Sequence, residues 1–92
     1  MSLQTLLIKY IENSDKVLSE ITLRQTAATL NQEKIFAVIE YAKRYLSDAK
    51  YYREKKQFKT SLAAVCYCEG LLDALRLLET VEFTWPNLKT KL

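Results

Sequence analysis

The sequence predicts an all-α fold: a three-helix, up-down-up antiparallel bundle followed by an extended C-terminal tail. Its 92 residues include one glycine and one proline, whereas strands joined by tight turns usually need several of each. Three segments repeat apolar residues every three or four positions, which is the helical period. Because a chain of this length supports one hydrophobic core, we expect one bundle over residues 1–80 and a tail over residues 81–92.

The first helix is expected over residues 2–24, where leucine and isoleucine recur on one stripe from Leu3 to Ile21. Asn31 is a favourable N-cap, so the second helix is expected over residues 32–55. A charged break then precedes the third helix, expected over residues 58–80, which is apolar around most of its circumference. Short connections between helices of similar length favour antiparallel neighbours. The tail should be extended because the residue before Pro86 avoids the helical region.

The composition excludes several classes of function. The longest apolar run, Leu62 to Cys68, is too short to cross a membrane, and the first residues lack the layout of a signal peptide, so we expect a cytoplasmic protein. There is no histidine, which removes the usual acid/base at neutral pH. Cys66 and Cys68 are two apart on a predicted helix and point away from each other, so we expect reduced packing residues. The sequence therefore predicts no enzyme, no cofactor and no metal site.

Three short motifs resemble a known family. They are Ala42-Lys43-Arg44-Tyr45-Leu46-Ser47-Asp48-Ala49, the turn Glu54-Lys55-Lys56-Gln57-Phe58, and Gly70-Leu71-Leu72-Asp73-Ala74-Leu75-Arg76-Leu77. The stretch from Tyr41 to Leu78 resembles an archaeal family of proteins of unknown function, domain of unknown function 357. The resemblance implies a spectrin-repeat-like bundle and no assigned activity. Family members tend to have glycine in the turn where this chain has Lys56.

A polar groove between the second and third helices is the first candidate site. Two sets of side chains, each at helical spacing, would line it. They are Tyr41, Tyr45, Asp48 and Tyr52 on the second helix, and Glu69, Gly70, Asp73 and Arg76 on the third. The alternative is that the tyrosines cover the edge of the core, that Asp73 and Arg76 form a surface pair, and that Gly70 permits close helix packing.

The second candidate is a basic patch at the turn between these helices. It consists of Lys50, Arg53, Lys55, Lys56 and Lys59, with Lys89 and Lys91 further along in the tail. Such a patch can bind phosphates. The alternative is a solvated loop, since the formal net charge is only +3 and no nucleic-acid recognition motif is present.

The third candidate is an interface formed by Phe83 and Trp85 of the tail, together with the apolar excess of the third helix and outward-pointing Phe36 and Tyr51. Grouped exposed aromatics are typical of interfaces. The alternative is that Trp85 folds back and completes the core.

Together these features favour a non-enzymatic protein-protein interaction module that binds a protein partner or self-associates. The alternative from another class is an RNA- or nucleotide-associated accessory domain that uses the basic turn. A small-molecule site in the tyrosine and carboxylate groove is a third hypothesis. No feature indicates binding to a membrane.

Overall fold

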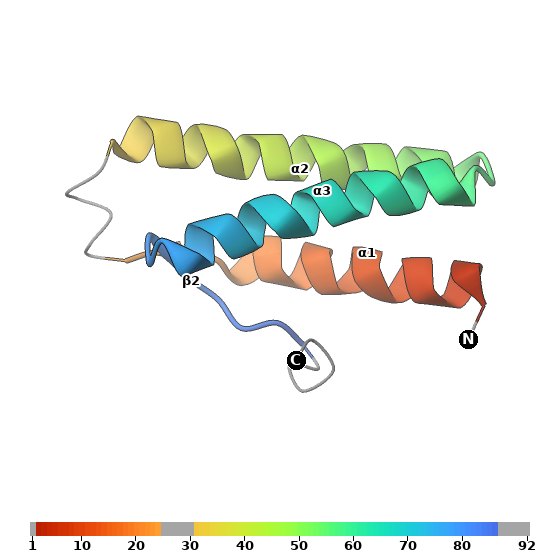
Figure 1. Cartoon of the computed structure of the whole chain (residues 1–92), viewed down its shortest axis with the longest axis horizontal. Coiled ribbons are helices and arrows are strands. Elements are labelled where there is room, and N and C mark those ends of the chain that lie inside the picture. Colours follow the sequence, from red (N-terminus) through yellow and green to blue (C-terminus); the bar gives the residue numbers. More distant parts are fainter. Residues whose placement is uncertain (1, 25–30, 87–92) are drawn as a thin grey trace.

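Three long helices lie side by side in the computed structural model of the chain, which describes residues 2–24 and 31–86. They are α1 (Leu3–Glu20), α2 (Gln32–Glu54) and α3 (Phe58–Leu77). α2 runs antiparallel to α1 and α3, so the predicted all-α, up-down-up bundle is confirmed (Figure 1).

No helix in residues 2–24 and 31–86 combines the length and the apolar character needed to span a membrane.

Polar side chains cap the amino ends of the first two helices. The Ser2 hydroxyl accepts a hydrogen bond from the backbone N–H of Thr5 at 3.1 Å. The predicted N-cap, Asn31, accepts one from the backbone N–H of Lys34 at 3.2 Å. These side chains satisfy N–H groups that have no partner within the helix.

The carboxyl ends of α2 and α3 share one backbone motif. Lys56 follows α2 with φ 62° and Glu79 follows α3 with φ 58°, so both adopt the left-handed conformation. In each case the next residue donates its N–H five residues back, Gln57 to the Tyr52 carbonyl and Thr80 to that of Leu75. This is the Schellman ending, in which the left-handed position is usually glycine. The glycine that family members tend to have at this position would therefore suit the turn. In this chain Lys56 adopts the same left-handed geometry.

The first and third helices end earlier than the sequence predicts. The chain leaves the helical conformation at Ile21 (φ −65°, ψ 136°), and Thr22–Leu23 forms β1 rather than the last turn of α1. β1 pairs antiparallel with β2 (Val81–Glu82), with Thr22 opposite Glu82 and Leu23 opposite Val81. Backbone bonds to the tail thus replace the helical bonds, as the β-branched residues at 21 and 22 favour.

Small residues bring α2 and α3 together. Ala42, Ala49 and Ala64 are buried where these helices meet the core, and the buried Ser61 hydroxyl donates to the carbonyl of Ala49. Larger apolar side chains from all three helices and the tail fill the remaining space. The main cluster contains Leu7, Ile11, Val17, Leu46, Val65, Cys68, Leu72 and Trp85, and a smaller one near the strand pair contains Ile35, Ile39, Leu75 and Val81.

Candidate functional site

The outer face of α3 differs in character from the exposed faces of the other helices. Its exposed positions from residue 60 to residue 74 carry no charged side chain; they are Thr60, Ala63, Cys66, Tyr67, Gly70 and Ala74. The exposed positions of α2, by contrast, include Glu33, Lys34, Glu40, Lys43, Arg44, Asp48 and Glu54. Because charged residues normally cover solvated helix faces, this apolar face requires an explanation. We refer to one set of residues as the α3 face: Ala63, Cys66, Tyr67, Gly70, Ala74 and Leu77, with the adjoining Tyr45 and Leu71.

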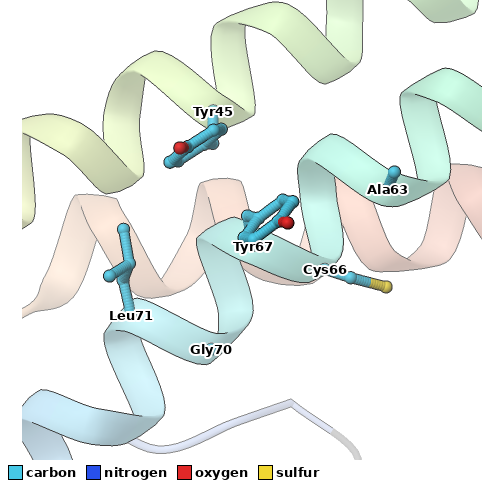
Figure 2. A pocket seen from close by; sticks show the side chains of 6 residues that line it. All are labelled: Tyr45, Ala63, Cys66, Tyr67, Gly70 and Leu71. Atoms are coloured by element: carbon cyan, nitrogen blue, oxygen red, sulfur yellow. The ribbon is translucent and has the colours of Figure 1, made fainter.

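A shallow groove of about 480 Å³ lies on the α3 face, lined by Tyr45, Ala63, Cys66, Tyr67, Gly70 and Leu71. Tyr45 reaches from α2 toward Tyr67 on α3, and Figure 2 shows the two rings face to face. Their centroids are 5.2 Å apart and their planes differ by 22°. Tyr67 is nevertheless 64% exposed, so one side of this aromatic pair is open to a ligand.

Gly70 forms the floor of this groove, and its own chain gives no packing reason for a glycine there. Apart from the local backbone of α3 itself, a Cβ built at Gly70 meets no atom within 4 Å in the described part of the chain. The expectation that Gly70 permits close packing between its own helices is therefore wrong. Glycine costs a helix interior about 1 kcal/mol relative to alanine, and this cost has no internal compensation. At this position the chain leaves open space along the groove.

The predicted polar groove does not form as one site. Of its α2 residues, Tyr45 alone lines the groove. Tyr41 is 54% exposed and lies beneath the Arg44 guanidinium. Tyr52 instead packs edge-on against Tyr51, and Asp48 is exposed. The α3 side chain that meets Tyr45 is Tyr67, which was not among the predicted groove residues.

The α3 members of the predicted groove lie on two different flanks of the helix. Gly70 lines the groove, whereas Asp73 contacts the tail and Arg76 pairs with Asp73 at 3.4 Å. Glu69 is buried. The physical reason is the step of about 100° per residue, which turns positions 69, 73 and 76 away from α2.

The predicted interface at Phe83 and Trp85 is wrong for Trp85, which is buried in the bundle. Its side chain is 3% exposed and belongs to the main core cluster. The indole N–H donates to Oδ1 of Asp73 at 2.6 Å, and the half-buried Phe83 ring packs edge-on against the indole at 5.1 Å. The tail thus completes the core of its own bundle, because removing the large apolar surface of a tryptophan from water lowers the free energy of the folded chain.

The basic patch is divided among several local contacts. Lys50 bridges to Asp15 of α1 at 2.8 Å, and the Lys55 ammonium lies 5.5 Å from the centre of the Tyr51 ring. Arg53 is half-buried, while Lys56 and Lys59 are exposed on the turn and the first turn of α3. Lys89 and Lys91 lie outside the described residues.

The two cysteines occupy different environments, which corrects the expectation that both are packing residues. Cys68 is buried and Cys66 is exposed at the groove, and neither forms a disulfide. Burial raises the pKa of the Cys68 thiol to about 11; the charges of Glu69 and Asp15 add to this rise, and the Ser14 hydroxyl opposes it. Between residues 2–24 and 31–86, no three histidine, cysteine or acidic side chains gather as metal ligands would.

Sequence reasoning missed four residues that line the groove: Ala63, Cys66, Tyr67 and Leu71. A signal for two of them, Ala63 and Tyr67, was present. Positions 63, 67, 70, 74 and 77 recur at intervals of three and four without a charge. That stripe lies opposite the buried stripe of α3, so its exposure follows from the helical period once the core face is known.

Comparison with known proteins identifies the family. The family model described as protein of unknown function DUF357 matches residues 9–81, which include all of α2 and α3 and the part of α1 from residue 9 onward. No curated protein and no solved structure matches the chain. The resemblance of the helical motifs is thereby confirmed over a longer stretch than those motifs cover, and the chain belongs to the DUF357 family.

Proposed function

We propose that this chain is a non-enzymatic helical module that docks a protein partner on the α3 face. The observation that carries the proposal is the uncovered apolar groove in which Tyr67 stacks on Tyr45 with its other side exposed. The proposal retains the archaeal origin and the cytoplasmic location expected from the sequence.

The energetics of the α3 face favour docking. Tyr67 and Leu77 are 64% and 74% exposed, and full burial of a side chain of this size contributes about 1.5–3 kcal/mol. Tyrosine suits a docking surface because its rigid ring gives a large contact area while its hydroxyl stays hydrated. A tyrosine anchor on a groove without charged lining residues matches the central part of a protein interface.

The chemistry of the groove supports the non-enzymatic part of the proposal. Its lining offers two phenols and one thiol, with no carboxylate, amine or imidazole among the six residues. General acid/base or nucleophilic catalysis needs a paired donor and acceptor with pKa values near the working pH. The other thiol, Cys68, is buried, and its pKa of about 11 keeps it protonated at neutral pH.

The alternative, an RNA- or nucleotide-associated domain, depends on the basic patch. Its contacts with Asp15 and Tyr51 already engage Lys50 and Lys55 within the chain. Exposed Lys56 and Lys59 are the members best placed to contact phosphates. The two proposals thus place the ligand at different positions, which one experiment separates.

The test places a photoreactive amino acid, p-benzoylphenylalanine, at one of two exposed tyrosines in cells of the source organism. Tyr67 probes the α3 face, and Tyr51, which is 58% exposed beside Lys55, is the matched control and probes the basic patch. We expect protein adducts from position 67 and few from position 51. RNA adducts from position 51, with none from position 67, would instead support the alternative.

A further inference from the structure

We propose that the partner on the α3 face is a second copy of this chain, with the two α3 helices antiparallel and crossing at Gly70. This inference rests on the proposed function and names its occupant. Three features of the described residues support it: the fit of side-chain sizes along the face, the charges at its ends, and the space at Gly70.

Side-chain sizes match at two pairs of positions, 63 with 77 and 66 with 74, when α3 is placed against itself about a two-fold axis through Gly70, while the same register places Tyr67 level with Asp73. Each residue then faces the one equally far from position 70 on the other side. Ala63 of one copy faces Leu77 of the other, and Cys66 faces Ala74. The most exposed apolar side chain of α3, Leu77 at 74%, therefore lies over the smallest residue at the far end of the groove. A two-fold pair repeats this contact at both ends.

Gly70 gives the crossing point. Since no described residue outside the local backbone of α3 comes within 4 Å of the Cβ position, the backbone of a second helix can approach there. Helix axes normally lie about 8–10 Å apart, and small residues at the contact allow the shorter distances. The contacts formed by close approach at Gly70 would offset the free-energy cost of a glycine in a helix interior.

The charges at the ends of the α3 face favour the antiparallel arrangement. Lys59 lies in the first turn of α3, where no acidic residue and no side-chain cap balances it. A cation at a helix amino end is unfavourable, whereas a cation at a carboxyl end is favourable. In the antiparallel pair, Lys59 of each copy comes beside the carboxyl end of the other copy's α3, which Glu79 follows. A parallel pair would instead bring the two Lys59 side chains together.

The size of the α3 face determines how tightly we expect the two copies to associate. At about 1.5 Å per residue, the 20 residues of α3 extend about 30 Å, and a helix is about 10–12 Å wide. One such strip gives a contact at or below the lower limit of about 1,200 Å² of total buried surface that specific, stable interfaces reach. We therefore expect a reversible dimer that forms with rising concentration, rather than a permanent one.

Sedimentation equilibrium of the full chain tests this directly. From about 1 µM to about 500 µM, the range in which a weak dimer forms, the mass should rise from 10.7 kDa toward twice that value. Gly70→Leu should raise the dimer Kd at least tenfold, about the effect of 1.4 kcal/mol. It should leave the thermal midpoint of the monomer unchanged or higher, because leucine favours a helix interior more than glycine does and a Cβ at Gly70 meets no described residue outside the local backbone of α3. The matched control is Ala37→Leu, a small-to-large change at an exposed position of α2, which should leave the Kd unchanged.

Disulfide cross-linking tests the orientation. In the Ala74→Cys variant, an antiparallel pair brings the new thiol opposite Cys66 of the other copy, within the separation that a disulfide needs. We expect mild oxidation to link positions 66 and 74 between copies. Links between the two Cys66 residues instead would indicate a parallel pair and overturn the proposed arrangement.

The outcomes separate this inference from the proposed function. A mass of 10.7 kDa at every concentration would overturn self-association. If position 67 still gave adducts with a different protein, the docking function would stand with another partner. A monomeric chain without adducts from position 67 would contradict both.

Discussion

The indole N–H of Trp85 donates to Oδ1 of Asp73 across a distance of 2.6 Å, and this bond attaches the tail to α3. Asp73 also receives the Arg76 guanidinium at 3.4 Å. A residue that the sequence placed in a ligand groove therefore holds the last described segment of the chain. The same contact accompanies the burial of Trp85, so the tail does not present its indole to a partner, whereas Tyr67 and Leu77 of the α3 face stay exposed.

Removal of the carboxylate should release the indole. We expect Asp73→Ala to lower the free energy of unfolding by about 1–3 kcal/mol, because it removes the carboxylate that accepts the part-buried indole N–H. Asp73→Asn keeps an acceptor oxygen and should cost less. Chemical denaturation followed by fluorescence measures both variants, since Trp85 is the single tryptophan of the chain. An Asp73→Ala variant as stable as the wild type would show that the bond contributes nothing.

Truncation of the indole itself should affect folding. We expect Trp85→Ala to cost about 3–5 kcal/mol of stability, the range for large-to-small changes in a core. Its dimer Kd, measured under conditions where the variant is folded, should equal that of the wild type. A variant with wild-type stability and weakened association would return Trp85 to an interface.

Glycine should stabilise both Schellman endings. Lys56 and Glu79 have φ of 62° and 58°, a conformation that strains a residue with a Cβ and not glycine. We expect Lys56→Gly and Glu79→Gly each to raise the free energy of unfolding by about 0.5–1 kcal/mol. Lys55→Gly is the control, because Lys55 has φ −80° and glycine there should destabilise. Thermal melts of the three variants would contradict this account if all three shifted in the same direction.

The buried thiol should make stability fall in alkaline solution. The pKa of Cys68 is about 11 in the folded chain against an ordinary value of 9.0. Between these values the folded state keeps a proton that the unfolded state has lost, so stability falls as pH rises through this window. The loss attributable to this group is about 2–3 kcal/mol by pH 11. Tyrosines and lysines titrate there too, so the measured quantity is the difference between the wild type and Cys68→Ala across the window. An equal slope for both proteins would contradict the assignment.

Much of the fold could be predicted because it depends on local periodicity. The three helices, the Asn31 cap and the exposure of Phe36 and Tyr51 all follow from spacing and capping chemistry. The pairing of Thr22–Leu23 with Val81–Glu82 could not be predicted in this way. Two residues carry no readable strand period, and their partner is at the other end of the chain.

The candidate site could be predicted only in part. The groove predicted from helical spacing included Tyr45 and Gly70, and both line the groove that forms. Helical spacing does not show which flank of α3 the tail covers, and the burial of Trp85 decides that. Asp73 and Arg76 were therefore assigned to the wrong flank, whereas Tyr67, which carries the aromatic surface, was not singled out.

Thiol labelling in cells tests most directly whether the α3 face is a docking surface. Cys66 lies exposed at the groove of the isolated chain, while Cys68 is buried and gives the unreactive baseline. The control is a new thiol in Tyr41→Cys, at an exposed position of α2. We expect a cell-permeable maleimide to modify Cys66 several times more slowly in cells of the source organism than in the dilute purified chain, with the control thiol reacting equally in both. Equal rates for Cys66 in cells and in the purified chain would contradict docking on this face.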